Sequence, residues 1–374
     1  MKIIADKDIY QVKESFSAFG DLELIPGREI SSSHIKGADA LLVRTVTKIN
    51  RDLLGSSSLR FIGSASSGYD HVDVEMLKEN GIFFCHAPGC NAAAVVDYVF
   101  AVLAWSACKQ SDQWLNKSVG IVGAGNVGSS LAKKLLALGM SVSIYDPFLQ
   151  SDHELASCFC TLEEALQNDI VTFHTALSDS GLYPTYHMVG IELLSMLKTD
   201  AILINASRGE VIDNAALSEF LSLRPDINVA LDVWENEPEI NLSLLNKVRI
   251  ATPHIAGYSL NGKLNGTRKI HDQFSRFFSL GDSSLVQEEN KTTLTIESEV
   301  ELQDYINNAI LSAYPIKNDF IGFDKADRRQ TAIDFDAFRN GYKFRKEFKD
   351  FQLVKNNKLA QYSEILQSLG FTVL

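Results

Sequence analysis

The sequence predicts an α/β protein with two doubly wound domains and a small C-terminal α+β domain. Three observations support this fold class. A glycine-rich turn within residues 118–147 joins an apolar strand to a helical pattern. Several other apolar runs each end in a polar or charged residue, as parallel strands do when their carboxyl ends line a site. From Lys291 onward, short strands alternate with amphipathic helices. At about 100–200 residues per domain, 374 residues have room for this arrangement.

The first predicted domain begins with residues 1–98. Helical stretches separate the strands that we expect at Lys2–Ile4, Leu41–Val43 and Phe61–Ser64. Ligands of open α/β sheets bind beyond the carboxyl ends of the strands. The polar residues that follow two of these strands are therefore candidate substrate contacts, although ordinary loop polarity would explain them equally well: Arg44, Thr45, Ser66 and Ser67.

A long apolar helix is expected from Ala92 to about Lys109, leading into a second domain at residues 99–254. Asp97 interrupts its apolar run, and the sequence contains no stretch of about 18 uncharged apolar residues. A buried helix therefore fits better than a membrane span.

Residues 118–147 carry the motif on which the functional interpretation depends. The strand Val119–Val122 leads into the turn GAGNVG at residues 123–128, then into a helix through Leu138 and a second strand that ends at Asp146. A glycine motif alone is weak evidence, but a strand before it, a helix after it and an acidic residue about 20 positions on complete a Rossmann-type dinucleotide fingerprint. An ordinary glycine-rich turn is the alternative.

Each residue of this fingerprint has a physical role. Gly123 permits the tight turn, Gly125 lets the backbone approach a pyrophosphate, and Gly128 lets the helix pack closely on the strand. The helix N-terminus supplies free N–H groups to the phosphates. Asp146 can accept hydrogen bonds from ribose hydroxyls, and no Arg or Lys follows it at residues 147–149 to neutralise a 2′-phosphate. NAD is therefore favoured over NADP.

Three charged residues stand at the ends of later strands, and their combination predicts the chemistry. Arg208 can hold a carboxylate through two parallel charge-assisted hydrogen bonds. His254 can take a hydroxyl proton near neutral pH, and Glu237 can orient its ring and stabilise the imidazolium. Singly each residue has an ordinary structural explanation. Together with a dinucleotide site they indicate oxidation of a 2-hydroxy acid.

The composition argues against several other classes of protein. The net charge of −12 argues against general affinity for nucleic acid, but a local basic cluster could still bind an anionic substrate. The five cysteines are odd in number and scattered, and their spacing fits no metal site. The first residues read as a strand rather than as a cleavable leader. We expect a cytoplasmic protein with no metal and no membrane partner.

Two different structures are expected beyond residue 254: a helix that belongs to the first domain and a separate small domain. A helix within residues 258–281 returns to the first domain, which thereby gains residues 255–285, and Asp282–Ser284 reads as a linker. Residues 286–374 then form a small α+β domain whose core is marginal alone, so we expect it to form a homodimer contact. Its basic residues could serve the substrate of the partner subunit or simply be solvated: Arg339, Lys343, Arg345 and Lys346.

Taken in order, the segments IVGAGNVG…YDP, FHT, INASRGEVID, LDVWENEPE and TPHIAGYS resemble the D-2-hydroxyacid dehydrogenase family. Further markers at residues 41–50, 64–73, 86–100, 173–187 and 252–267 extend the resemblance over most of the chain, more loosely beyond about residue 280. The resemblance implies an NAD-dependent, homodimeric dehydrogenase, and these markers narrow its substrate to a phosphorylated four-carbon hydroxy acid.

The family also implies roles for individual residues. Arg208 would bind the substrate carboxylate, Glu237 would orient the histidine, and His254 would transfer the proton. The implied NAD contacts, beyond the glycines, are Asn126, Val127, Asp146, Thr175, Asp232 and Gly257. The implied substrate contacts are Thr45, Ser66 and Tyr258. The alternatives are a dehydrogenase of the phosphoglycerate or glycerate type and, from another class, an NADH-sensing co-repressor.

Overall fold

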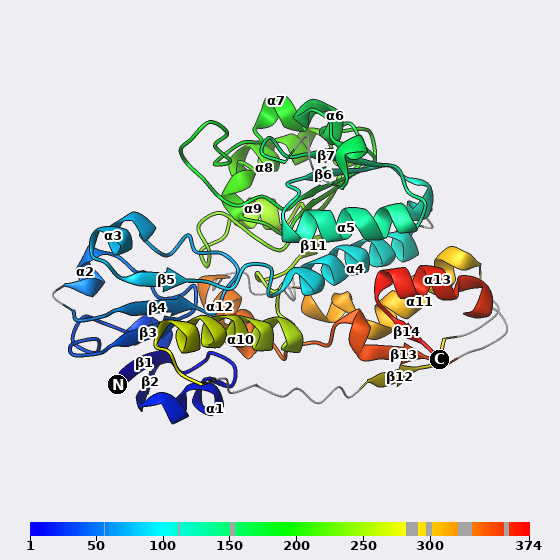
Figure 1. The fold of residues 1–374 in the computed structure, drawn as a ribbon. Coiled ribbons are helices and arrows are strands. Elements are labelled where there is room, and N and C mark those ends of the chain that lie inside the picture. Colours follow the sequence, from blue (N-terminus) through cyan, green and yellow to red (C-terminus); the bar gives the residue numbers. More distant parts are fainter. Residues whose placement is uncertain are drawn as a thin grey trace. The chain divides into compact units, whose positions relative to one another are not determined.

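The computed structural model describes residues 1–55, 57–110, 113–149, 154–281, 291–296, 301–320, 331–354 and 359–374. These residues form two compact units. Unit 1 takes the described residues within Met1–Asn91 and Ser259–Glu289, and unit 2 takes those within Ala92–Tyr258 and Asn290–Leu374. The expected linker at residues 282–284 lies outside the described residues. Figure 1 labels the elements of both units.

Unit 1 contains a parallel five-stranded sheet with the strand order β2-β1-β3-β4-β5. Its strands are β1 (Lys2–Asp6), β2 (Asp21–Ile25), β3 (Ala40–Val43), β4 (Phe61–Ser64) and β5 (Phe83–Cys85). The three predicted strands are confirmed, and all four residues of β3 and of β4 are buried. The two edge strands β2 and β5 were not predicted, because each mixes exposed and buried residues.

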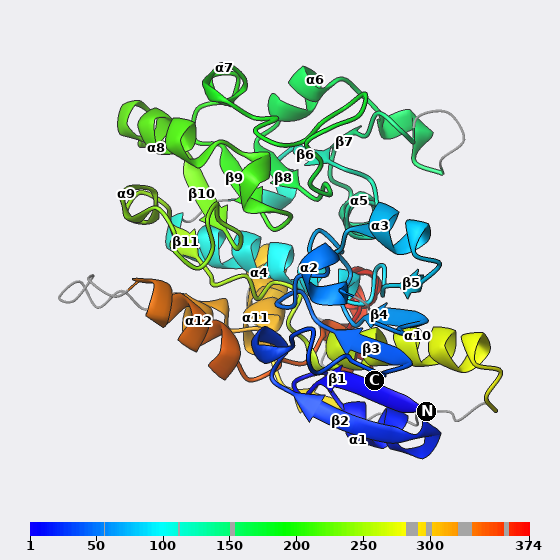
Figure 2. The ribbon, with the colours of Figure 1, turned by 90° about the vertical axis from the view of Figure 1, so that its left-hand side faces the viewer.

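Helices cover the two faces of this sheet. On one face α10 (Leu260–Phe277) lies along the strands, and Phe274 packs edge-on against Phe61 of β4 with ring centroids 5.2 Å apart (Figures 1 and 2). The remaining helices of unit 1 are short: α1 (Val12–Phe16), α2 (Arg51–Leu54) and α3 (Val74–Glu79). The helices of unit 1 thus come from both of its chain segments: α1, α2 and α3 from the first and α10 from the second.

Unit 2 is built on a parallel six-stranded sheet with the order β11-β10-β9-β8-β6-β7. Its strands are β6 (Val119–Val122), β7 (Val142–Tyr145), β8 (Ile170–Phe173), β9 (Ile202–Asn205), β10 (Asn228–Leu231) and β11 (Ile250–Ala251). The chain leaves β6 first toward β7 and then crosses back to β8, so the strand order reverses beside β6. Such a reversal is where open α/β sheets bind their ligands.

Helices pack on both faces of the six-stranded sheet, which makes it doubly wound as predicted. One face packs against α4 (Ala92–Gln110) and α5 (Asn126–Ala137). The other face packs against short helices: α6 (Leu162–Leu166), α7 (Ile191–Leu194), α8 (Asn214–Leu223) and α9 (Leu242–Leu245). Residues alternate between the two cores along each strand, as the pleat requires.

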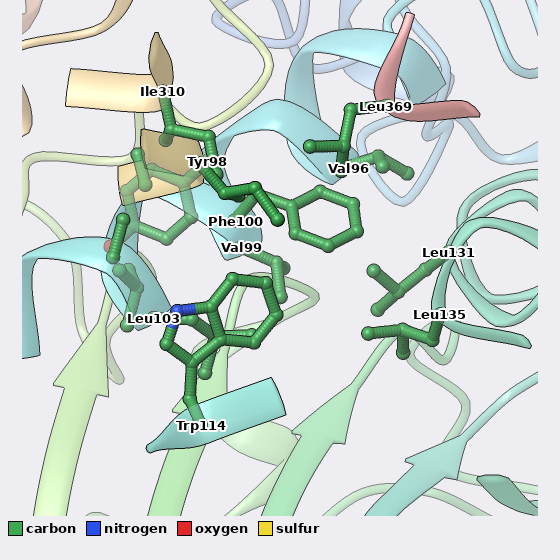
Figure 3. Packing of buried hydrophobic residues seen from close by; sticks show 14 of the residues in the cluster. Val96, Tyr98, Val99, Phe100, Leu103, Trp114, Leu131, Leu135, Ile310 and Leu369 are labelled. Atoms are coloured by element: carbon green, nitrogen blue, oxygen red, sulfur yellow. The ribbon is translucent and has the colours of Figure 1, made fainter. Parts of the chain in front are cut away.

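Helix α4 is the centre of the larger core. By length and composition alone Ala92–Lys109 could cross a membrane, but 72% of that window is buried inside the structure. Figure 3 shows its side chains between α5 and the C-terminal helices, with Trp114 beneath them. The indole Nε1 of Trp114 donates to Asn307 Oδ1 at 2.8 Å, so the apolar core also has a fixed polar contact. These contacts agree with the prediction of a buried helix.

The C-terminal residues add a small parallel sheet with helices. Its strands β12 (Thr292–Leu294), β13 (Phe351–Leu353) and β14 (Thr372–Val373) lie in that order. The helices are α11 (Leu302–Ala313), α12 (Thr331–Gly341) and α13 (Leu359–Leu369). The predicted strands and helices are thus present. Apolar residues of β13, α11 and α13 share one core with α4 and α5 inside unit 2, whereas Phe335 of α12 packs in the core on the other face of the six-stranded sheet.

Candidate active site

The glycine-rich turn between β6 and α5 has the geometry that a bound pyrophosphate needs. Gly123 has φ 96°, and a Cβ there would lie 2.8 Å from the carbonyl oxygen of His174. A Cβ on Gly128 would lie 1.9 Å from the carbonyl oxygen of Gly123. At Gly125, in contrast, a Cβ would meet no heavy atom of the described residues within 4 Å. The chain can therefore turn tightly, pack closely and still leave the backbone accessible at Gly125.

Asp146 is held beside this turn. One carboxylate oxygen accepts a hydrogen bond from the N–H of Ala124 at 2.8 Å, and the other accepts one from the N–H of Phe148 at 3.0 Å. The carboxylate is only partly buried. It keeps acceptor capacity for ribose hydroxyls, because an ionised carboxylate has about four acceptor sites.

The end of β8 supplies two buried polar atoms that suit a ligand. His174 Nδ1 and Thr175 Oγ1 are buried and have no hydrogen-bond partner among the described residues. The other ring nitrogen of His174, Nε2, lies 2.9 Å from Thr172 Oγ1. Burial lowers the pKa of His174 to about 3, so the ring is neutral. Buried polar groups normally have partners, and these two atoms lie beside the glycine turn, so the residues present fit a dinucleotide.

The predicted pair of His254 and Glu237 is formed in unit 2. His254 Nδ1 lies 2.7 Å from Glu237 Oε2, and Glu237 Oε1 accepts a hydrogen bond from the N–H of Trp234 at 2.9 Å. Burial raises the pKa of Glu237, but the charge and hydrogen bond of His254 outweigh that effect and leave the pKa below its usual value. Glu237 is therefore ionised. It orients the histidine so that Nε2 is the nitrogen left for proton transfer.

The loop that carries His254 is fixed by Asp232. Asp232 is buried, and its carboxylate accepts hydrogen bonds from Thr252 Oγ1 at 2.7 Å and from the N–H groups of Ile255 at 2.8 Å and Ala256 at 2.9 Å. The N–H of His254 donates to the carbonyl oxygen of Asp232 at 2.7 Å. These bonds hold His254 at φ 58°, a conformation that non-glycine residues rarely adopt. Asp232 thus positions the loop, and its implied NAD contact stays a prediction.

A second support for this loop comes from the C-terminal part of unit 2. The partly buried guanidinium of Arg345 donates to the carbonyl oxygens of Ile255 at 3.1 Å and Tyr258 at 3.3 Å. It also donates to those of Ala256 and, at 2.8 Å, of Ala94 at the start of α4. The sequence analysis noted Arg345 only as one of several basic residues. No local pattern predicts that it would bind a loop that lies about 90 positions earlier.

Arg208 follows β9 in the same unit. Its backbone carbonyl accepts a hydrogen bond from Asn205 Nδ2 at 2.9 Å, and its Nη1 donates to the carbonyl oxygen of Ser207 at 2.7 Å. The side chain is partly buried. Like His254 and Glu237, it follows the carboxyl end of a strand of the six-stranded sheet, as predicted.

Of the other predicted substrate contacts, Tyr258 belongs to unit 2, whereas Thr45, Ser66 and Arg44 lie in unit 1. Thr45 is exposed, and Ser66 Oγ lies 2.6 Å from Ser64 Oγ. Arg44 forms ion pairs with Asp6 at 2.7 Å and with Asp8 at 2.8 Å, so its charge is already balanced twice. Of the three, Arg44 is thus the least suited to a further anion.

The fold and the geometry of unit 2 define a Rossmann-fold dehydrogenase. Residues 101–256 match the family model described as D-isomer specific 2-hydroxyacid dehydrogenase, NAD binding domain. An erythronate-4-phosphate dehydrogenase of Proteus mirabilis is 41% identical over 99% of this chain and 99% of its own length. One of Photorhabdus laumondii is 41% identical over 100% of this chain and 99% of its own.

Solved structures show the same fold. D-lactate dehydrogenase of Aquifex aeolicus with NAD and lactic acid has a TM-score of 0.64 and 25% identity, covering 75% of this chain and 96% of that one. The chain therefore belongs to the D-isomer-specific 2-hydroxyacid dehydrogenase family, in the group of the erythronate-4-phosphate dehydrogenases.

Proposed function

We propose that this protein oxidises 4-phospho-D-erythronate to (R)-3-hydroxy-2-oxo-4-phosphooxybutanoate with NAD, a step of pyridoxine 5′-phosphate (vitamin B6) biosynthesis. Relatives named erythronate-4-phosphate dehydrogenase align with nearly the whole chain, including its C-terminal part. The observation that carries the proposal is the hydrogen bond of 2.7 Å between His254 and the partly buried, ionised Glu237.

The proposed chemistry assigns one role to each of three residues. NAD, when bound, accepts the hydride from the carbon that bears the hydroxyl group. His254 takes the hydroxyl proton on Nε2, because its Nδ1 is occupied by Glu237. Glu237 stabilises the imidazolium that results. Arg208 holds the substrate carboxylate with two charge-assisted hydrogen bonds.

The cofactor contacts follow from the turn and the strand ends of unit 2. Asp146 selects NAD, since no cation follows it and its carboxylate would repel a 2′-phosphate. Thr175 supports the assignment with its buried hydroxyl oxygen, for which the described residues offer no partner. The full set of proposed contacts is Gly123, Gly125, Asn126, Val127, Gly128, Asp146, Thr175, Asp232 and Gly257.

For the substrate we propose contacts from Thr45, Ser66, Tyr258 and Arg44, the last with the least support because of its two ion pairs. We also propose a cytoplasmic homodimer in which residues 286–374 make the dimer contact. The division into a substrate domain (1–98 and 255–285), an NAD domain (99–254) and this third part is likewise a proposal. Its support is the separate sheet that each part contains.

A substrate screen tests the function directly. The purified protein is mixed with NAD and each candidate acid, and NADH absorbance is followed. We expect kcat/KM to be highest for 4-phosphoerythronate and lower for erythronate, 3-phosphoglycerate and glycerate. A higher value for either of the three-carbon acids would replace the proposed substrate. Absence of turnover with every acid would favour the co-repressor alternative.

A further inference from the structure

Arg339 on α12 contacts the loop that carries the proposed catalytic histidine. Its Nε donates a hydrogen bond to Tyr258 Oη at 3.0 Å, and its guanidinium carbon lies 5.8 Å from the centre of the tyrosine ring. Tyr258 is at the end of the loop that begins at His254. Arg339 and these loop residues all belong to unit 2. Figure 2 shows α12, which carries Arg339, in orange.

The terminal amino groups of Arg339 have no hydrogen-bond or ion-pair partner among the described residues, because its one hydrogen bond there is made by Nε. The negative charges of Glu237 and Asp232 favour the charged form of this guanidinium. Burial lowers the pKa of Arg339, but Tyr258 and these carboxylates outweigh it, so the pKa is raised and the charge is kept.

The other basic residues of this segment have different surroundings. Arg345 is partly buried and donates to backbone carbonyls, as described above. Lys346 Nζ donates to Thr292 Oγ1 at 2.7 Å. Lys343 is exposed. Arg339 alone among these four combines a partly buried side chain, a contact with Tyr258 and terminal N–H groups with no partner among the described residues.

We propose that Arg339 is the receptor for the phosphate group of the substrate. An arginine fork matches phosphate with two parallel N–H···O bonds, and a charge partly shielded from water attracts an anion more strongly than a fully exposed one. Arg208 would then bind the carboxylate at the other end of the acid. The inference rests on the proposed function.

The test compares two substrates that differ only in the phosphate. In Arg339→Gln, we expect KM for 4-phosphoerythronate to rise about 10- to 100-fold, because a charge-assisted phosphate contact is lost. KM for erythronate and for NAD should not change. In Arg339→Lys, KM for 4-phosphoerythronate should lie between the values of the wild type and of Arg339→Gln, since lysine keeps the charge but lacks the two parallel donors of the guanidinium. Lys343→Gln, which removes an exposed charge close by, should behave as the wild type. Tyr258→Phe separates the loss of the tyrosine contact from the loss of the phosphate contact, because it keeps the guanidinium.

Each other outcome contradicts the proposal. An equal rise of KM for both acids would place Arg339 at the carboxylate, and a rise confined to NAD would place it at the cofactor. If the kinetics of Arg339→Gln were unchanged, Arg339 would have no role in binding the substrate or NAD. A Tyr258→Phe effect as large and as phosphate-selective as that of Arg339→Gln would assign the contact to Tyr258.

Calorimetric titration of inorganic phosphate into the NAD-loaded protein separates failure of this inference from failure of the proposed function. Binding by the wild type that Arg339→Gln abolishes supports the phosphate receptor even if 4-phosphoerythronate is not turned over. Equal binding by both proteins overturns it even if 4-phosphoerythronate is the substrate. Far-UV circular dichroism of Arg339→Gln checks that the variant is folded.

Discussion

The hydrogen bond between His254 and Glu237 determines the first prediction at the scale of single residues. Replacing His254 by Ala removes the proposed base, so kcat should fall by about 10²–10⁴, the usual contribution of acid–base catalysis. The NAD affinity should stay close to that of the wild type, because the glycine turn and Asp146 are untouched. Steady-state kinetics and a fluorescence titration with NADH measure both values.

Glu237→Gln should have a smaller effect and a different signature. The lowered pKa of Glu237 keeps its carboxylate ionised, and its contribution is lost only as the pH falls through that lowered value. Without this charge the protonated ring is less favoured, so the acid limb of the kcat profile should move to lower pH. A profile that coincides with the wild type would argue that Glu237 does not act on the histidine.

Asp146 determines the choice of cofactor at the same scale. Its two backbone hydrogen bonds fix the carboxylate beside the glycine turn. Asp146→Ala, especially combined with Pro147→Arg, should weaken NAD binding and relax the preference toward NADP, because a cation replaces the repulsive carboxylate. The measurement is KM for each cofactor. Equal use of both cofactors by the wild type would refute the assignment of Asp146.

At the scale of elements, Arg345 connects the start of α4 to the loop of residues 254–258. Arg345→Met should leave several buried carbonyl groups without a donor, at a cost of about 1–3 kcal/mol in the free energy of unfolding for each unsatisfied group. We also expect kcat to fall, because the same bonds hold the loop of His254. Chemical denaturation and steady-state kinetics test this, with Lys343→Gln as the control. A variant that lost stability but kept its kcat would show that the loop does not depend on Arg345.

Asp97 on α4 makes the contact between α4 and the C-terminal segment depend on pH. Its carboxylate accepts a hydrogen bond from the N–H of Phe348 at 2.8 Å. Burial raises the pKa of Asp97 to about 7, although Lys134 opposes this effect. Because the folded state favours the protonated form of Asp97, this residue stabilises the fold at low pH. That stabilisation is lost as the pH rises and the carboxyl group ionises. Asp97→Asn should therefore gain stability relative to the wild type as the pH rises from about 4 to 7. A difference in unfolding free energy that is constant with pH would contradict this.

Local patterns account for the elements that the sequence could predict. β6, the glycine turn and α5 follow from residues that are adjacent in the chain, and so do the polar ends of β9 and β11. The edge strands β2 and β5 were missed, because β2 alternates acidic and apolar residues and β5 is only three residues long. The contacts of Arg339 with Tyr258 and of Arg345 with Ala94 join residues far apart in the chain. No periodicity indicates such contacts, so only the structure identifies them.

At the scale of the whole molecule, the C-terminal segment contributes to the core of unit 2 and is also proposed to form the dimer contact. An experiment must separate these two roles. Its helices α11 and α13 share a core with α4 and α5, so removing residues 291–374 would uncover apolar residues of that core that remain, such as Phe100 on α4 and Leu131 on α5. Truncation is therefore expected to destabilise unit 2 rather than to yield a clean monomer. Point substitutions on the exposed surface are the better test of the proposed dimer contact.

Phe338 offers such a substitution, since it lies on α12 and 46% of it is exposed. If the C-terminal segment forms the homodimer contact, the wild type should sediment as a dimer and Phe338→Glu should shift it toward monomer, because a buried carboxylate would be unpaired in the interface. Leu182→Glu is the matched control, since Leu182 is 81% exposed and lies outside the C-terminal segment. A dimeric Phe338→Glu would exclude this surface of α12 from the contact, and a monomeric wild type would refute the dimer altogether. A Leu182→Glu variant that dissociates as readily would move the contact to the loop after β8.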